Sequence, residues 1–181
     1  MHVLRLARCV SLLAIAGCAT AGSSSAAAPL NGPTFGISSP GRRALVGVWR
    51  VAQFCNVDSA GTQSYPLGAS PIGVFVYTTT GQLSLHATRT PAARPFVAGD
   101  NAPTDAERRT LLDGYFGYFG TYTITSDSTV IHHVAGGTIP SYIGTDQLRY
   151  YRIRPGGVNA PDTLSIGSHA SLGCRKLIRV G

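Results

Sequence analysis

The sequence predicts an all-β protein, a closed antiparallel barrel of about eight short strands accompanied by one short helix. Two observations lead to this fold class. From residue 44 onward, β-branched and aromatic residues alternate with polar ones in short runs separated by turn residues, which is typical of strands with one buried face. A single segment has a helical pattern instead. Many short antiparallel strands favour closure, because a barrel has no exposed sheet edges.

The expected strands are bounded by turn residues. They cover 45–54, 72–79, 82–88, 120–125, 129–135, 146–153, 163–167 and 171–180. Turns are expected at Thr80-Gly81, at residues 126–128 (Ser-Asp-Ser) and at residues 155–157 (Pro-Gly-Gly), because these residue types favour turn conformations.

The expected helix begins at a capping box. Thr104 and Glu107 have the spacing at which a hydroxyl and a carboxylate satisfy the free amides of a first helical turn. Apolar residues then recur at helical spacing, at Leu112, Tyr115, Phe116 and Phe119. We therefore expect the helix to carry one apolar face made by these four residues.

The N-terminal residues have the layout of a signal peptide. A basic segment with Arg5 and Arg8 precedes a short apolar stretch closed by small residues, and this stretch is far below the roughly 20 residues that a membrane-spanning helix needs. Residues 13–18, Leu-Ala-Ile-Ala-Gly-Cys, resemble a bacterial lipobox. The resemblance implies cleavage before Cys18 and lipid on its thiol. The alternative is an ordinary signal peptide ending near Ala21.

Three segments follow from this interpretation. Residues 1–17 form a lipoprotein signal peptide, and residues 18–40 begin with the lipidated cysteine and continue as a tether rich in Ala, Ser, Gly and Pro, a composition that cannot bury a core. Residues 41–181 fit one domain with a single core. Because Ala19, rather than an Asp, follows Cys18, the resemblance favours a lipid anchor in the outer membrane, with the domain facing the periplasm.

Charge and cysteine content narrow the classes of partner. Removing Arg5 and Arg8 lowers the formal net charge from +7 to +5, and no basic run is dense enough to indicate nucleic-acid binding. Loss of Cys9 and lipidation of Cys18 leave Cys55 and Cys174, a plausible disulfide in an oxidising periplasm. Two separate buried thiols are the alternative. Neither cysteine has a second Cys or a His at metal-ligand spacing, so no metal site is expected.

Several motifs, in order along the chain, resemble the bacterial lipocalin-like domain family. They are Leu45-Val46-Gly47-Val48-Trp49-Arg50, Ser64-Tyr65-Pro66-Leu67-Gly68, Gly73 with Tyr77-Thr78, Gly81, Tyr118-Phe119-Gly120-Thr121-Tyr122, His132-His133-Val134, Pro140-Ser141-Tyr142, and Gly144-Thr145-Asp146-Gln147 with Arg149. The resemblance implies a calycin-type, up-and-down lipocalin-like barrel. It also implies that Trp49 closes the barrel base beneath a basic residue. Tyr142 stands where the family commonly has Trp, and the two cysteines are not a family feature.

The strand pattern also indicates which polar residues face the barrel interior. Val130 and Val134 as core residues place His132 inside and His133 outside. On the next strand, Arg149, Tyr151 and Ile153 face inward. With three further tyrosines these residues would line an apolar cavity with a few polar tips, as in a small-ligand site. The candidate ligand-binding residues are Tyr77, Tyr118, Tyr122, His132, Arg149 and Tyr151.

Each candidate residue also has a structural alternative. His132 would be hydrogen-bonded in the core rather than bind a metal. Arg149 would pair with Asp113 or Asp146, or cover Trp49, instead of meeting a ligand anion. The tyrosines would pack the barrel, with their hydroxyl groups bonded.

Three functional classes remain, in the order binder, interaction module and enzyme. We expect a monomer that binds a small, largely apolar ligand. A non-catalytic envelope protein that contacts partners through its loops is the alternative, and a barrel isomerase or cyclase acting on an apolar substrate is the second. No nucleophile elbow, metalloprotease motif, phosphate-binding loop or dinucleotide fingerprint occurs, so no catalytic residue and no cofactor is assigned. A roomy cavity would favour a binder or an enzyme, and a filled barrel would favour the module.

Overall fold

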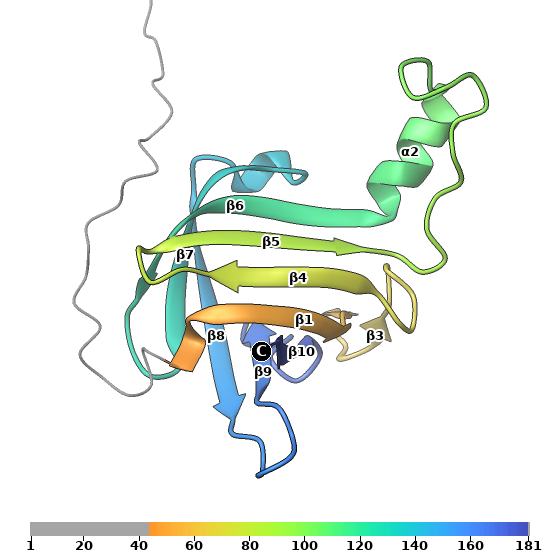
Figure 1. The fold of residues 1–181 in the computed structure, drawn as a ribbon. Coiled ribbons are helices and arrows are strands. Elements are labelled where there is room, and N and C mark those ends of the chain that lie inside the picture. The colour runs from red at the N-terminus through yellow and green to blue at the C-terminus, as the bar shows by residue number, and fades with distance from the viewer. Residues whose placement is uncertain (1–43, 181) are drawn as a thin grey trace, which may run out of the picture.

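In the computed structural model, which describes residues 44–180, the chain forms a closed barrel of eight antiparallel strands (Figure 1). The barrel strands are β1 (Gly47–Gln53), β4 (Ile72–Tyr77), β5 (Gln82–Thr88), β6 (Tyr115–Ile124), β7 (Thr129–Gly137), β8 (Asp146–Arg154), β9 (Thr163–Gly167) and β10 (Lys176–Val180). Each pairs with the next in this order, and β10 pairs with β1. The predicted all-β, up-and-down barrel is confirmed. The predicted signal peptide and the predicted tether both lie outside the described residues.

Most predicted strands match the observed ones within a few residues; the exceptions are the two ends of the domain and β6, which begins five residues before the predicted 120–125. Leu45 belongs to a short helical turn before β1. Residues 171–174, expected as strand, form turns that precede β10. Three short elements were not predicted: β2 (Asn56–Val57), β3 (Gln63–Ser64) and the 3-10 turn η1 (Pro140–Tyr142).

The predicted capping box is confirmed, but the predicted apolar face of the helix is wrong. Helix α2 (Asp105–Asp113) has Thr104 as its N-cap, and the Thr104 backbone N–H donates to Glu107 Oε2 at 2.7 Å. The helix ends at Gly114, and none of its residues is buried. Among residues 44–180, no helix is long and apolar enough to cross a membrane.

The aromatic residues that were expected on the helix belong to β6. Tyr115, Phe116 and Phe119 pair with β5 instead, since Gly114 ends the helix and aromatic side chains suit a half-buried strand. Gly120 is needed on β6 because a Cβ there would collide with the carbonyl oxygen of His133 on β7. The backbone periodicity therefore changes from 3.6 to 2 at Gly114, and Phe119 points outward, 44% exposed.

The interior of the barrel follows the alternation of each strand. Buried side chains from all eight strands form one core. The buried core residues on the strands are Trp49, Val51, Phe75, Tyr77, Leu83, Leu85, Ala87, Tyr118, Tyr122, Val130, Val134, Tyr151, Leu164, Ile166 and Leu177. Ile153, expected to face inward, packs against this core.

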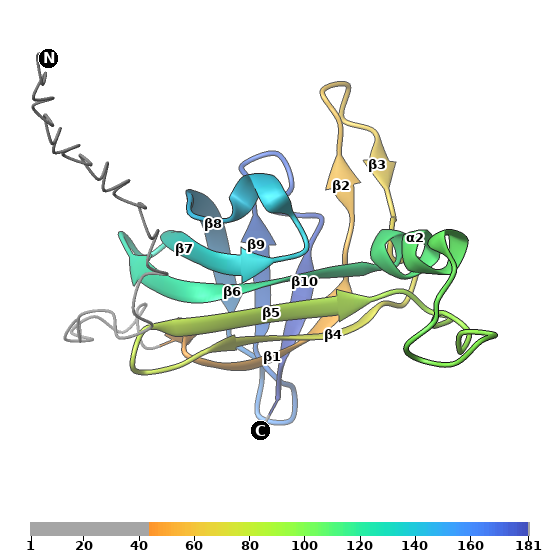
Figure 2. The same cartoon turned by 90° about the horizontal axis from the view of Figure 1, so that it is seen from above.

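The two ends of the barrel differ. We call the end at which β1 begins the closed end, and the end at which β1 finishes the open end. The closed end contains the start of β1, where Trp49 Nε1 donates to the Leu45 carbonyl at 2.9 Å. The guanidinium carbon of Arg179 lies 4.1 Å from the Trp49 ring centroid. The basic residue over Trp49 is therefore Arg179. The other, open end carries the β2–β3 hairpin, and α2 projects beyond the barrel next to the start of β6 (Figures 1 and 2).

A disulfide joins the first and last barrel strands at the open end. Cys55 follows β1 and Cys174 precedes β10, and their Cα atoms are 5.3 Å apart. The predicted pairing is confirmed, although the two cysteines lie just beyond the strands rather than on them. Because β1 and β10 are hydrogen-bonded neighbours, the disulfide reinforces the seam at which the barrel closes.

Replacing both cysteines, as Cys55→Ala with Cys174→Ala, should lower the free energy of unfolding. The two residues are 119 positions apart, and in the chain-entropy model a cross-link over such a loop contributes about 4 kcal/mol. Urea unfolding measures this change. Dithiothreitol should destabilise the wild-type protein by a similar amount and leave the double variant unaffected. Equal stability of the oxidised and reduced wild-type proteins would contradict a stabilising role.

Candidate functional site

A line of hydrogen bonds crosses the interior of the barrel at His132. This side chain on β7 is 0% exposed. Its Nε2 lies 3.1 Å from the Tyr77 hydroxyl on β4, and its Nδ1 lies 2.7 Å from the Tyr118 hydroxyl on β6. A neutral imidazole has one donor and one acceptor nitrogen, so it accepts from one tyrosine and donates to the other. His133 points outward, as predicted, and its Nδ1 lies 2.6 Å from Asp146 Oδ1.

Burial keeps all three members of this line neutral. It is the main cause that lowers the pKa of His132 well below its usual value, and the charges of Arg149 and His133 add to it. Burial also raises the pKa of the Tyr77 and Tyr118 hydroxyls. At neutral pH the site therefore offers neutral hydrogen-bonding groups.

Tyr122 and Tyr151 use their hydroxyl groups on backbone carbonyls near the closed end. Tyr122 donates to Thr78 at 2.6 Å, and Tyr151 donates to Ser126 at 3.1 Å. Burial raises the pKa of Tyr122 to about 12. The structure thus places both predicted ligand residues inside the barrel, where they pack the wall. Their contact with a ligand stays a prediction.

Arg149 points inward on β8 and is 8% exposed. Its guanidinium donates to the carbonyl of Leu148 at 3.0 Å and to Oε1 of Gln147 at 3.2 Å, and lies 5.4 Å from the Tyr142 ring centroid. Within residues 44–180 it forms no ion pair. Neither structural role expected for Arg149, pairing with an Asp or covering Trp49, is observed within residues 44–180. Asp146 contacts His133 instead, and Asp113 makes no salt bridge in this part of the chain. Arg179, rather than Arg149, covers Trp49.

Arg175 is a second cation at the open end, and the sequence analysis missed it. Its guanidinium carbon lies 4.5 Å from the ring centroid of Phe54. It donates to Oδ1 of Asn56 at 3.0 Å and to the carbonyl of Cys55 at 3.5 Å. Burial lowers the pKa of Arg175, and the nearby charge of Arg149 lowers it further. The only sequence signal was its position next to Cys174.

Four aromatic rings lie between these two arginines in a continuous series. The ring centroids are 4.9 Å apart for Phe54 and Phe116, 5.6 Å for Phe116 and Tyr118, and 6.1 Å for Tyr118 and Tyr142. We call the four rings with Arg149 and Arg175 the mouth cluster. It combines an apolar surface with two cations, and through Tyr118 it contacts His132.

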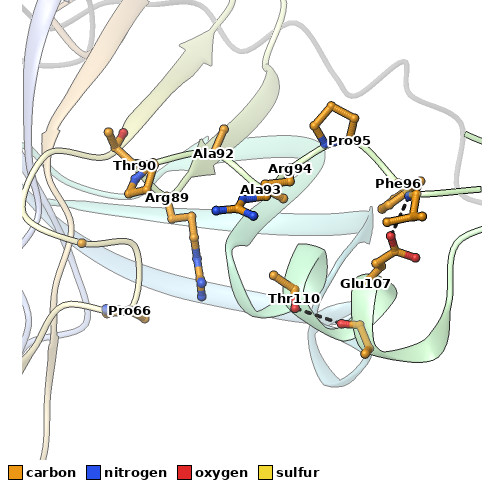
Figure 3. Close-up of a pocket in the computed structure, with 14 residues that line it drawn as sticks. Pro66, Arg89, Thr90, Ala92, Ala93, Arg94, Pro95, Phe96, Glu107 and Thr110 are labelled. Atoms are coloured by element: carbon orange, nitrogen blue, oxygen red, sulfur yellow. Dashed lines mark hydrogen bonds between the residues drawn. The ribbon is translucent and has the colours of Figure 1, made fainter. Parts of the chain in front are cut away.

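A separate pocket of about 730 Å³ lies outside the barrel, beside α2 (Figure 3). The loop after β5, a turn before β4 and one face of α2 form its walls. Glu107 ties the loop to the helix by accepting from the Val97 backbone N–H at 2.9 Å. Figure 3 shows the side chains of Arg89 and Arg94 in this pocket. It was not predicted, because it depends on how a Pro- and Ala-rich loop folds back over the helix. We call it the α2 pocket. Its lining residues include Pro66, Pro91, Ala92, Ala93, Pro95, Phe96, Ala106 and Thr110.

Residues 44–180 bring together no group of three or more His, Cys, Asp or Glu side chains that could hold a metal ion. The sequence profile of the lipocalin-like domain family matches residues 46–171. The chain belongs to this family. The matched part of this lipocalin-like protein ends before Cys174 and Arg175. No curated protein matches the chain.

Stability should fall as the pH falls below about 6.5, in a way that depends on His132. Its pKa is lower in the folded than in the unfolded protein, so between these two values only the unfolded state binds the proton. The loss reaches about 1.4 kcal/mol per pH unit. It is measured by urea unfolding between pH 7 and 5.

The control for this measurement is a matched pair of variants. His132→Gln should be less stable at pH 7 but should lose this pH dependence. His169→Gln, which alters an exposed histidine stacked on Tyr150, should keep it. An identical slope in wild type and His132→Gln would show that His132 is not held neutral by burial.

Proposed function

We propose that this barrel is a monomer and binds a small, largely apolar ligand at its open end, with Arg149, Tyr118 and His132 as its polar contacts. The observation that carries the proposal is the state of Arg149. It is buried, yet within residues 44–180 no carboxylate pairs with it. Burying a cation without a counter-charge is unfavourable, and an anionic or acceptor group on a ligand would compensate it.

The remaining candidate residues fit this proposal by their positions. Arg149 reaches Tyr118 with a hydrogen bond that offsets part of the rise in the tyrosine pKa. Tyr118 in turn contacts His132, and His132 contacts Tyr77. Hydrogen-bonded polar groups thus extend from the open end into the interior of the barrel, while Tyr122 and Tyr151 pack in the barrel wall. The ligand's polar group would meet Arg149, and its apolar body would lie against Phe116 and Tyr142, the partly exposed rings of the mouth cluster.

The electrostatics favour binding over catalysis. A general acid or base works best with a pKa near the working pH. Burial moves the pKa of His132 down and the pKa of Tyr77 and Tyr118 up, in each case away from neutrality. This supports a binder more than a barrel isomerase or cyclase.

Tyr142→Ala should weaken binding of the neutral probe N-phenyl-1-naphthylamine about tenfold. The change removes one ring of the mouth cluster, and an aromatic contact with its buried area contributes roughly 1–2 kcal/mol. Fluorescence titration of the purified protein gives the affinity. Tyr142→Trp, which restores the residue common in the family, should bind at least as well as wild type.

Tyr150→Ala is the matched control for this titration. Tyr150 neighbours Tyr151 on β8 but points to the outer face, where it stacks on His169, so its loss should leave probe binding unchanged. Failure of the wild-type protein to bind the probe would overturn the proposal. So would an equal loss of affinity in the Tyr142→Ala and Tyr150→Ala variants.

We further propose that the protein is exported and anchored in the outer membrane, facing the periplasm, by lipid on Cys18. The lipobox-like residues 13–18 and the small residue Ala19 support this location. The disulfide between Cys55 and Cys174 adds support, because such bonds persist in oxidising compartments such as the periplasm.

Cys18→Ser should abolish lipidation and leave the protein unprocessed or soluble. The lipid is attached through the cysteine thiol, and several acyl chains on one residue give stable anchoring. Membrane fractionation and intact-mass measurement follow the outcome, with Cys9→Ser as the control that should remain in the membrane fraction. A Cys18→Ser protein that fractionates like wild type would contradict the anchor.

A further inference from the structure

We infer that Arg149 and Arg175 together form an anion site at the mouth of the barrel, and that the ligand class is an apolar organic acid. The anionic group would lie between the two guanidinium groups, with the apolar body against the aromatic rings. This inference rests on the proposed function and adds to it the second cation and the charge of the ligand.

The geometry places both arginines on one aromatic surface. Arg149 lies over Tyr142 at 5.4 Å, at one end of the series of rings. Arg175 lies over Phe54 at 4.5 Å and over Phe116 at 5.8 Å, at the other end. A ligand that lies against the partly exposed rings of Phe116 and Tyr142 would therefore be flanked by a cation on each side.

The charges of the two arginines are not compensated by the described part of the chain. Their hydrogen-bond acceptors are two backbone carbonyls, the side-chain oxygens of Gln147 and Asn56, and the Tyr118 hydroxyl, all neutral. A guanidinium has five N–H groups, so each retains donors for a further acceptor. The charge of Arg149 also lowers the pKa of Arg175, which indicates that two like charges lie close together. An anion between them would turn this repulsion into two attractions.

Both side chains are held in place before a ligand arrives. Arg149 is on a barrel strand, and its neighbours fix its guanidinium by two hydrogen bonds. Arg175 follows the disulfide-bonded Cys174 and binds the carbonyl of its partner, Cys55. Pre-organised guanidinium groups suit carboxylates and related planar anions, which they bind bidentately. The partly exposed rings of Phe116 and Tyr142 favour an acid with an apolar body, because an inorganic anion would leave them uncovered.

The test compares two probes that share their aromatic rings and differ in charge. 1-Anilinonaphthalene-8-sulfonate is an anion, and N-phenyl-1-naphthylamine lacks the sulfonate. We expect Arg149→Met and Arg175→Met each to weaken binding of the anionic probe at least tenfold, as loss of a charge-assisted contact should. Binding of the neutral probe should change less than twofold, which also shows that the variant barrel is intact. Arg175→Lys should lose less than Arg175→Met, because it keeps the charge.

The α2 pocket supplies the matched control, since it also contains two arginines in apolar surroundings. Arg89→Met and Arg94→Met should leave the affinity of both probes unchanged. Loss of anionic-probe binding in these variants would move the anion site to the α2 pocket and overturn the inference. Equal effects on both probes in the Arg149 and Arg175 variants would also overturn it, while leaving the apolar site of the proposed function intact. Wild-type protein that binds only the anionic probe would overturn the apolar site instead.

Discussion

Pairing between β1 and β10 is the interaction on which the rest of the structure depends, because it turns a sheet into a barrel. The two strands run antiparallel, with Trp49 opposite Arg179 and Val51 opposite Leu177. Closure leaves the barrel strands without a free edge and fixes which face of every strand is inside. The isolation of His132 from water, and therefore the lowering of its pKa, follows from this seam.

Closure also gives the two ends different electrostatics. At the closed end, Arg179 contacts Asp162 at 2.9 Å, binds the carbonyls of Val46 and Ala44, and covers Trp49. The positive charge of Arg179 is therefore paired with the carboxylate of Asp162. At the open end, Arg149 and Arg175 meet only neutral acceptors within the described chain. The same residue type thus stabilises the fold at one end and leaves an unbalanced positive charge at the other.

The sequence predicted the features that depend on local pattern and missed those that depend on contacts across the fold. Alternation of apolar residues correctly placed His132 and Arg149 inside, and accounting for the cysteines correctly paired Cys55 with Cys174. The predicted apolar face of the helix is wrong because it combines apolar residues on both sides of Gly114, where the helix ends. Their spacing fits the helical period, but the pairing of β6 with β5 places Tyr115, Phe116 and Phe119 on a strand, where Phe116 faces the core and Phe119 faces outward.

Arg175 and the α2 pocket could not be found from pattern alone. Arg175 lies in a stretch expected as one continuous strand, where the observed turn before β10 changes its orientation. Its aromatic neighbours, Phe54 and Phe116, come from distant parts of the chain, and only barrel closure brings them together. The α2 pocket likewise needs the loop after β5 to fold back, held by Glu107.

The direction of β1 has a consequence for access to the barrel. The described chain enters at the closed end, beside Trp49, and β10 also finishes there, since Val180 pairs with Val48. The chain that leads toward the proposed lipid anchor on Cys18 therefore joins the barrel at the closed end, opposite the mouth cluster. In that arrangement, the proposed ligand would enter and leave at the end of the barrel opposite the attachment.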